Sequence, residues 1–326
     1  MVPYFTAELL GPEQWIRLEA VAAVPEREPL TALADARAAA LLPQAEVLLT
    51  SWGCPPLDES VLARAPRLRA IVHAAGTVKL HVTDACWARG LQVSSAAAAN
   101  ALPVAEYTLA AILFANKRVF HLQQRYRALR AVRLWPAEAP GLGNYGKVIG
   151  IVGASQVGRR VLELLRPFDF EVLVHDPWID AAAAVALGAR WVELDALLAA
   201  SDVVSLHAPA LPETHHLLDR RRLALLRDGA VLINTARGSL LDTAALTAEL
   251  VAGRIDAVLD TTEPELLPAD SPLYELPNVV LTPHIAGALG NETRRMADLA
   301  IDEIARLGRD EPLRHAVRRA DLARLA

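Results

Sequence analysis

The sequence has few of the residues that build disulfide-linked, nucleic-acid-binding or membrane-spanning proteins. Its 2 cysteines in 326 residues are too few for a disulfide scaffold and lack the spacing of a zinc site. We expect Cys54 and Cys86 to be free, buried thiols in a reducing cytosol. The net charge of −5 at pH 7 gives no overall attraction to nucleic acid. No uninterrupted apolar run approaches the roughly 18 residues of a membrane helix, and the N-terminus lacks the pattern of a signal peptide.

The chain instead alternates short apolar runs with helical patterns. Hydrophobic residues make up 53% of it and charged residues 22%, close to ordinary globular usage, and its length predicts about two domains. Strands are predicted at 46–50, 68–73, 91–94, 148–152, 171–175, 203–207, 230–234, 255–259 and 278–281. Helices are predicted at 105–122 and 292–307, and a turn-rich connection between units at 133–146. The alternation indicates βαβ units, and the apolar strands indicate parallel sheets covered on both faces.

A strand that runs into a glycine-containing loop and a helix, VIGIVGASQVG at 148–158, is typical of a dinucleotide-binding site. Gly153 and Gly158 take the first and last glycine positions, and Ser155 stands where the middle glycine is usual. Its Cβ would push a pyrophosphate outward, or its hydroxyl would donate a hydrogen bond to it. The residues expected to line the pyrophosphate site at the helix N-terminus are Gly153, Ser155, Gln156, Val157 and Gly158.

Asp176 follows the next predicted strand, 18 residues after Gly158. An acidic residue near this spacing accepts hydrogen bonds from the adenosine ribose and repels a 2′-phosphate, which predicts NAD rather than NADP. The alternative is that Asp176, which precedes Pro177, is only a turn residue.

Three later strands end in polar segments, at 234–239, 260–265 and 282–287. Ligands of an open α/β sheet bind beyond the carboxyl ends of its strands, so we expect the three segments to meet in one crevice. Taken alone, His284 would read as a capping or core histidine and Arg237 as a partner in a structural ion pair.

These segments, with PVAEYTL at 103–109 and SLHAPALPETHHLL at 205–218, resemble the NAD-dependent D-2-hydroxyacid dehydrogenases over nearly the whole chain. The resemblance implies an α/β fold of two doubly wound parallel-sheet domains. A flavodoxin-like substrate domain would comprise residues 1–115 and 291–326, and an inserted Rossmann NAD-binding domain residues 116–290. It implies hydride transfer between NAD(H) and a small 2-oxo or 2-hydroxy acid by a cytoplasmic homodimer, with no metal, nucleic-acid or membrane partner.

The resemblance also implies roles for particular residues. Arg237 would bind the substrate carboxylate, His284 would give and take the proton, and Glu265 would pair with His284, because the family's glutamate lies five residues after the strand-end aspartate. These residue types fit the reaction: histidine titrates near neutrality, a carboxylate favours the imidazolium, and arginine holds a carboxylate bidentately. Further cofactor contacts are implied for Thr108, His207, Ala208, Pro209, Thr235, Ala236, Asp260, His284 and Gly287, with Asp260 facing the nicotinamide amide. The backbone of Ala75 and Gly76 would bind the substrate together with Arg237 and His284.

Two departures and two other functions stay open. Where the family usually has an aspartate–asparagine pair, this chain has Thr77, Val78 and Lys79, so Lys79 either reaches a second anionic group of the substrate or is a solvated lysine. His215 and His216 are interpreted as ordinary surface residues, because adjacent residues on a helix do not face one site.

An NAD-sensing corepressor-like protein or a phosphite dehydrogenase would carry the same catalytic residues. Formate is disfavoured, because formate-oxidising relatives usually have glutamine where Glu265 stands.

Overall fold

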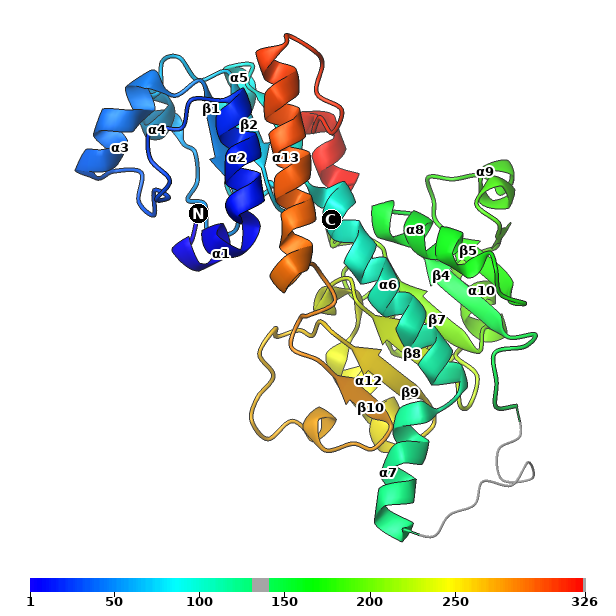
Figure 1. Ribbon diagram of the computed structural model, residues 1–326. Helices are drawn as coiled ribbons and strands as arrows, with labels where there is room; N and C mark the ends of the chain where they lie inside the picture. Colours follow the sequence, from blue (N-terminus) through cyan, green and yellow to red (C-terminus); the bar gives the residue numbers. More distant parts are fainter. Residues whose placement is uncertain (131–140, 325–326) are drawn as a thin grey trace. The chain divides into compact units, whose positions relative to one another are not determined.

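The computed structural model describes residues 1–130 and 141–324 as two compact α/β units (Figure 1). One unit comprises Met1–Ala101 and the segment from Ala288 onward, and the other comprises Leu102–Gly287. The predicted α/β class with parallel sheets is confirmed. Residues 133–140 of the predicted connection lie outside the described residues.

The division between the units lies earlier in the chain than the predicted domain boundaries. It falls within helix α6 (Ala97–Asn116), at 101/102, and again at 287/288. The physical reason is that Ala105, Ile112 and other apolar residues of α6 belong to the core of the second unit. Which unit binds substrate and which binds NAD stays a prediction.

The first unit contains a parallel sheet whose strands are β1 (Val47–Thr50), β2 (Ala70–His73) and β3 (Gln92–Ser95), in that order. Its helices are α1 (Pro3–Leu9), α2 (Pro12–Val21), α3 (Ala36–Leu41), α4 (Glu59–Arg64), α5 (Asp84–Ala88) and α13 (Thr293–Gly308). Alternate residues of β2 point to opposite faces: Val72 packs with α1, α2 and α13, and Ile71 packs with α3, α4 and α5. Helices therefore cover both faces.

The three strands of the first unit follow the order of the chain in the sheet. The residues before β1 form helices, and α1 and α2 each begin with a proline near the first helical position, where its fixed φ favours a helix.

The second unit contains a seven-stranded parallel sheet in the order β10-β9-β8-β7-β4-β5-β6. The strands are β4 (Val148–Val152), β5 (Glu171–His175), β6 (Arg190–Trp191), β7 (Val203–Leu206), β8 (Val231–Asn234), β9 (Asp256–Leu259) and β10 (Val279–Leu281). The helices are α7 (Val119–Leu129), α8 (Gln156–Leu165), α9 (Ala181–Ala186), α10 (Leu194–Ala200), α11 (Arg220–Leu223) and α12 (Thr243–Val251). The order reverses between β4 and β7, which is where dinucleotides bind in Rossmann folds.

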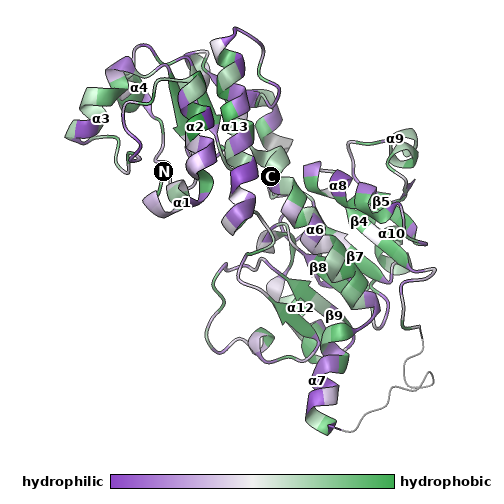
Figure 2. Ribbon diagram, viewed as in Figure 1, coloured by the Kyte–Doolittle hydropathy of each residue, from purple (hydrophilic) through white to green (hydrophobic). Residues whose placement is uncertain are grey.

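Helices cover both faces of this sheet. Residues of α6 and α8 form one core with β4, and residues of α10, α11 and α12 form the other. The strands are hydrophobic along their length, whereas α13 and α7 show hydrophilic stretches (Figure 2). The nine predicted strands are confirmed, and β6, which has two residues, was not predicted.

Helix α6 is long and apolar enough to cross a membrane by length and composition alone, a test that core helices also pass. It has a physical reason to be apolar, because Ala105, Ala111, Ile112 and Ala115 pack into the core of the second unit. The predicted helix 105–122 is two helices, since α6 ends at Asn116 and the left-handed Arg118 (φ +47°) precedes α7.

Candidate active site

The glycine loop after β4 folds closely against the segment after β7. Gly153 has a φ of +98°, and a Cβ there would lie 2.6 Å from the backbone nitrogen of Ala208. In the first turn of α8, a Cβ on Gly158 would lie 2.0 Å from the carbonyl oxygen of Gly153. Both positions therefore require glycine, because a side chain at either would collide with the protein's own backbone.

Ser155 is the N-cap of α8. Its hydroxyl oxygen accepts a hydrogen bond from the backbone N–H of Gly158 at 3.3 Å. The hydroxyl hydrogen stays available to a ligand, and the positive end of the helix dipole favours an anion here. Gln156 and Val157 follow in the same turn.

Asp176 is buried and fastens the end of β5 to the glycine loop. Its Oδ2 accepts the N–H of Ala154 at 2.6 Å, and its Oδ1 accepts the N–H of Trp178 at 2.7 Å. It is therefore a turn residue that also lies beside the pyrophosphate loop. Each carboxylate oxygen keeps a further lone pair, so a contact with ribose stays a prediction.

His207 is buried next to the glycine loop, and one of its ring nitrogens has a hydrogen-bond partner. Its Nε2 lies 2.9 Å from the Ser205 hydroxyl, and burial lowers its pKa to about 3. Its Nδ1 has no hydrogen-bond partner among the described residues. Its backbone lies close to Gly153, and its Cβ lies close to Gly158.

The end of β8 forms a turn that Asn234 organises. Its side chain accepts the N–H of Ala236 at 3.1 Å and donates to the carbonyl of Arg237 at 2.9 Å. Between them, the hydroxyl of Thr235 lies 3.1 Å from that of Thr108 on α6. Sequence reasoning did not select Asn234, although an asparagine at the start of a turn is a recognised signal for such bonds.

Arg237 is half-buried at the end of this turn. Its Nη1 donates to the carbonyl of Ala236 at 2.6 Å. Burial lowers its pKa, and the charge of Glu265 acts in the opposite direction. A Cβ on the next residue, Gly238, would lie 2.0 Å from the backbone of Thr262, so this loop packs closely on the segment after β9.

Asp260 holds the loop that carries His284. It is 2% exposed and accepts bonds from the Thr282 hydroxyl at 2.6 Å, the Ile285 N–H at 2.8 Å and the Ala286 N–H at 2.9 Å. Its own carbonyl accepts the N–H of His284 at 2.9 Å. These bonds stabilise His284 in the left-handed region, at a φ of +56°, which L residues adopt rarely.

The structure places Glu265, not Glu263, beside His284. The Nδ1 of His284 lies 2.6 Å from Oε1 of Glu265, and the two side chains are 48% and 63% exposed. A carboxylate at Nδ1 fixes the tautomer of the ring and leaves Nε2 to exchange a proton with a ligand. This pair, Arg237 and the glycine loop all follow the carboxyl ends of strands of one sheet.

The remaining predicted residues are placed as follows. Ala208 and Pro209 follow β7, and Gly287 follows the His284 loop. Ala75 and Gly76 belong to the other unit, in the segment after β2, where the carbonyl of Ala75 accepts the N–H of Ala96 at 3.0 Å.

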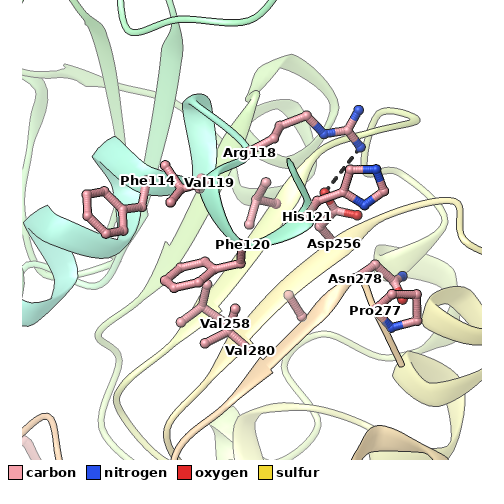
Figure 3. Close-up of a pocket in the computed structure, with 13 residues that line it drawn as sticks. Phe114, Arg118, Val119, Phe120, His121, Asp256, Val258, Pro277, Asn278 and Val280 are labelled. Atoms are coloured by element: carbon pink, nitrogen blue, oxygen red, sulfur yellow. Dashed lines mark hydrogen bonds and ion pairs between the residues drawn. The ribbon is translucent and has the colours of Figure 1, made fainter. Parts of the chain in front are cut away.

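A separate hollow lies at the other ends of the strands of the second unit (Figure 3). Phe114, Arg118 and Phe120 line it from α6, α7 and the turn between them, and Arg118 pairs with Asp256, the first residue of β9, at 3.3 Å. Because it lies at the amino ends of β9 and β10, it is distinct from the His284 region.

The chain is similar to known proteins over most of its length. The family described as "D-isomer specific 2-hydroxyacid dehydrogenase, NAD binding domain" matches residues 109–286. D-3-phosphoglycerate dehydrogenase of Mycobacterium tuberculosis is 35% identical over 272 residues, 82% of this chain and 50% of that protein. Glyoxylate reductase of Thermofilum pendens is 36% identical over 250 residues, 75% of this chain and 73% of that protein.

A solved phosphoglycerate oxidoreductase from Rhizobium etli has a TM-score of 0.78 and 25% identity, covering 96% of this chain and 95% of that one. The chain spans about half the length of the phosphoglycerate dehydrogenases it matches.

Proposed function

The chain belongs to the D-isomer specific 2-hydroxyacid dehydrogenase family, and on this premise we propose that it transfers a hydride between NAD(H) and a small 2-oxo or 2-hydroxy acid. The observation that carries the proposal is the exposed His284–Glu265 pair, held at 2.6 Å. It follows strands of the same sheet that forms the glycine loop.

The glycine loop fits NAD, because Gly153 and Gly158 allow the tight turn from β4 into α8 against the backbone of Ala208, which places a helix N-terminus beside the position of a pyrophosphate. The bound nicotinamide supplies or accepts the hydride. Asp176 lies at the end of β5, where its charge disfavours the 2′-phosphate of NADP. Thr108, Thr235 and Asp260 are buried, and we propose that they contact the cofactor, with Asp260 facing the nicotinamide amide.

The chain's own residues bind the acid and move its proton. Arg237 holds the substrate carboxylate with two parallel hydrogen bonds. His284 gives a proton from Nε2 to the carbonyl oxygen during reduction and takes it back during oxidation. Glu265, at Nδ1, orients the ring and stabilises the imidazolium.

The first unit also carries residues that we expect to bind substrate. The backbone of Ala75 and Gly76 would bind the substrate carboxylate together with Arg237. Lys79, an exposed residue of the same segment, is the candidate contact for a second anionic group, as a phosphorylated or sulfonated acid would carry. The proposal includes a cytoplasmic homodimer without nucleic-acid or membrane partners, as the family resemblance implies.

A substrate panel tests the proposal. NADH and NADPH oxidation is followed with glyoxylate, pyruvate, phosphohydroxypyruvate and sulfopyruvate, and NAD reduction is followed with phosphite. We expect NADH-linked turnover of at least one 2-oxo acid, lost in His284→Ala. Tight NADH binding without turnover of any 2-oxo acid would instead support an NAD-sensing binding protein, and turnover of phosphite alone would support a phosphite dehydrogenase.

Lys79→Ala separates the two interpretations of that residue. If Lys79 contacts a second anion, the variant loses activity on dianionic acids and keeps it on glyoxylate. Equal relative rates on both classes would make Lys79 a solvated lysine.

A further inference from the structure

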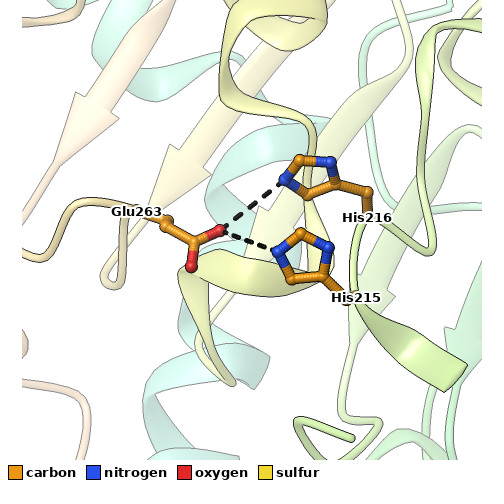
Figure 4. Close-up of side chains that lie close together, drawn as sticks. All are labelled: His215, His216 and Glu263. Carbon is orange, nitrogen blue, oxygen red and sulfur yellow. Dashed lines mark ion pairs between the residues drawn. The ribbon is translucent and has the colours of Figure 1, made fainter. Parts of the chain in front are cut away.

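Two adjacent histidines after β7 face the same side of the chain, contrary to the sequence interpretation. That interpretation placed His215 and His216 on a helix, but the short helix Pro212–Thr214 ends before them. His215 is extended, and His216 has a φ of +50° in the left-handed region. Their rings therefore stack, with centroids 3.9 Å apart and planes 24° apart (Figure 4).

A carboxylate from another loop completes a three-residue cluster. Oε2 of Glu263 lies 3.7 Å from Nε2 of His215 and 3.7 Å from Nε2 of His216. The three donor atoms all lie within 4.8 Å of one another, and the three residues are exposed. The side chains point toward one another from two separate loops (Figure 4).

The backbones on both sides of the cluster are fixed. The N–H of His216 donates to the carbonyl of Ser239 at 2.8 Å, and Leu218 forms a bridge with Leu241. The carbonyl of Glu263 accepts the hydroxyl of Thr243 on α12 at 2.8 Å. A ligand held by the three side chains would therefore need to order only the side chains and not the backbone, which reduces the entropy lost on binding.

From this geometry we propose that His215, His216 and Glu263 form a site for a first-row divalent transition metal ion such as Zn²⁺. Two imidazoles and one carboxylate are a donor set that Zn²⁺ uses with water in the fourth position, whereas Mg²⁺ and Ca²⁺ prefer oxygen donors alone. Metal–donor bonds of about 2.0–2.2 Å in a tetrahedron separate the donors by roughly 3.3–3.6 Å. The 3.7 Å separations from Glu263 to the two histidines are close to this range. All three donor atoms lie within 4.8 Å of one another, and the exposed side chains can close the remaining difference by rotation.

A bound ion would link two loops of the second unit. His216 is hydrogen-bonded to Ser239, which lies two residues after Arg237, and Glu263 lies two residues before Glu265. Because the folded chain presents the three ligands together and the unfolded chain does not, the ion stabilises the folded state by mass action. Binding of the ion does not depend on the proposed dehydrogenase activity.

Metal titration of the whole chain tests this site. After EDTA treatment and dialysis, Zn²⁺ is titrated by calorimetry, Co²⁺ serves as a spectroscopic probe of a four-coordinate site, and Mg²⁺ is the negative control. We expect one equivalent of Zn²⁺ to bind and to raise the melting temperature, and Co²⁺ to give visible absorption bands.

Single variants assign the ligands. His215→Ala, His216→Asn and Glu263→Gln should each weaken Zn²⁺ binding at least about tenfold, which corresponds to ~1.4 kcal/mol. Asparagine is chosen because it tolerates the left-handed backbone at this position. His121→Ala, in α7, is the matched control and should bind Zn²⁺ like the unaltered chain.

Two results would overturn the site. One is Zn²⁺ affinity no better than millimolar in the unaltered chain, which would leave only a histidine–glutamate ion pair. The other is Zn²⁺ affinity unchanged in a His216→Asn, Glu263→Gln double variant that keeps the melting temperature of the EDTA-treated chain, which would place the bound ion elsewhere.

Discussion

Two carboxylates of the second unit, Asp260 and Glu265, differ in burial and in the groups they contact. Asp260 is 2% exposed and accepts three hydrogen bonds from its own chain, all from the loop that carries His284. Glu265 is 63% exposed and contacts His284 with one oxygen. Asp260 therefore uses its oxygens to hold the loop in place, whereas Glu265 can stabilise a proton that His284 receives.

This difference separates positioning from chemistry. A buried carboxylate is stable only when hydrogen bonds compensate its lost hydration, so Asp260 and Asp176 reflect how the loops are fixed. An exposed pair makes little difference to the free energy of unfolding, so its geometry is better explained by a reaction. Variants of Asp260 should therefore change the free energy of unfolding, whereas variants of His284 and Glu265 should change kcat.

The largest effect is expected at the exposed pair. His284→Ala removes the group that transfers the proton, and such groups contribute about 10²–10⁴-fold to rates. We expect kcat to fall within that range, with a much smaller change in the melting temperature. A fall of less than tenfold in kcat on the best substrate would show that the proton comes from elsewhere.

The buried side of the comparison is tested with Asp260→Asn. The amide has one acceptor oxygen, so at least one donor from Thr282, Ile285 or Ala286 loses its partner. Such a loss costs about 1–3 kcal/mol, to be measured as the free energy of unfolding in urea.

The matched control is Glu265→Gln, which should change that free energy by less than about 0.5 kcal/mol while lowering kcat. The comparison fails if Glu265→Gln destabilises the chain as much as Asp260→Asn does.

Buried histidines should make the free energy of unfolding depend on pH. Burial lowers the pKa of His207 to about 3, whereas in the unfolded chain it lies near 6.5. The unfolded chain therefore binds a proton that the folded chain does not, and stability is complete above pH 6.5 and falls as the pH decreases toward 3. At pH 5 the loss from this residue is about 2 kcal/mol.

His207→Asn should flatten the dependence of the unfolding free energy on pH between 7 and 5 by that amount. In the first unit, His73 flanks the Ala75 segment and burial lowers its pKa to about 3 as well, so His73→Asn should flatten the dependence similarly. An unchanged slope in both variants would mean that these histidines are protonated in the folded chain.

Much of the second unit can be read from the sequence because its signals are local. Apolar runs predicted β4, β7 and β8, and Gly153 and Gly158 occupy positions that backbone contacts restrict to glycine, whereas the ribose contact of Asp176 stays a prediction. The choice of Glu265 over Glu263 came from the family's spacing, and the structure places Glu265 against His284.

What the sequence could not predict depends on contacts between distant residues or on single backbone angles. The helical interpretation of His215 and His216 was wrong because one left-handed residue turns their rings together. The three bonds to Asp260 come from residues 22 to 26 positions away, and no local pattern shows them.

The smallest expected effect concerns Ser155, whose hydroxyl combines a structural hydrogen bond with a predicted contact to a ligand. Its oxygen accepts the Gly158 N–H, and its hydrogen is left to donate. Ser155→Ala should lower the unfolding free energy by about 1 kcal/mol, and Ser155→Gly by only a few tenths, because glycine is a tolerable N-cap.

If the hydroxyl donates to the pyrophosphate, both variants weaken NADH binding by a similar factor, up to roughly tenfold for one hydrogen bond. Fluorescence titration with NADH measures this factor. Tighter binding in Ser155→Gly than in the unaltered chain would show instead that the Cβ pushes the pyrophosphate outward, and that the usual middle glycine is absent here at a cost in cofactor affinity.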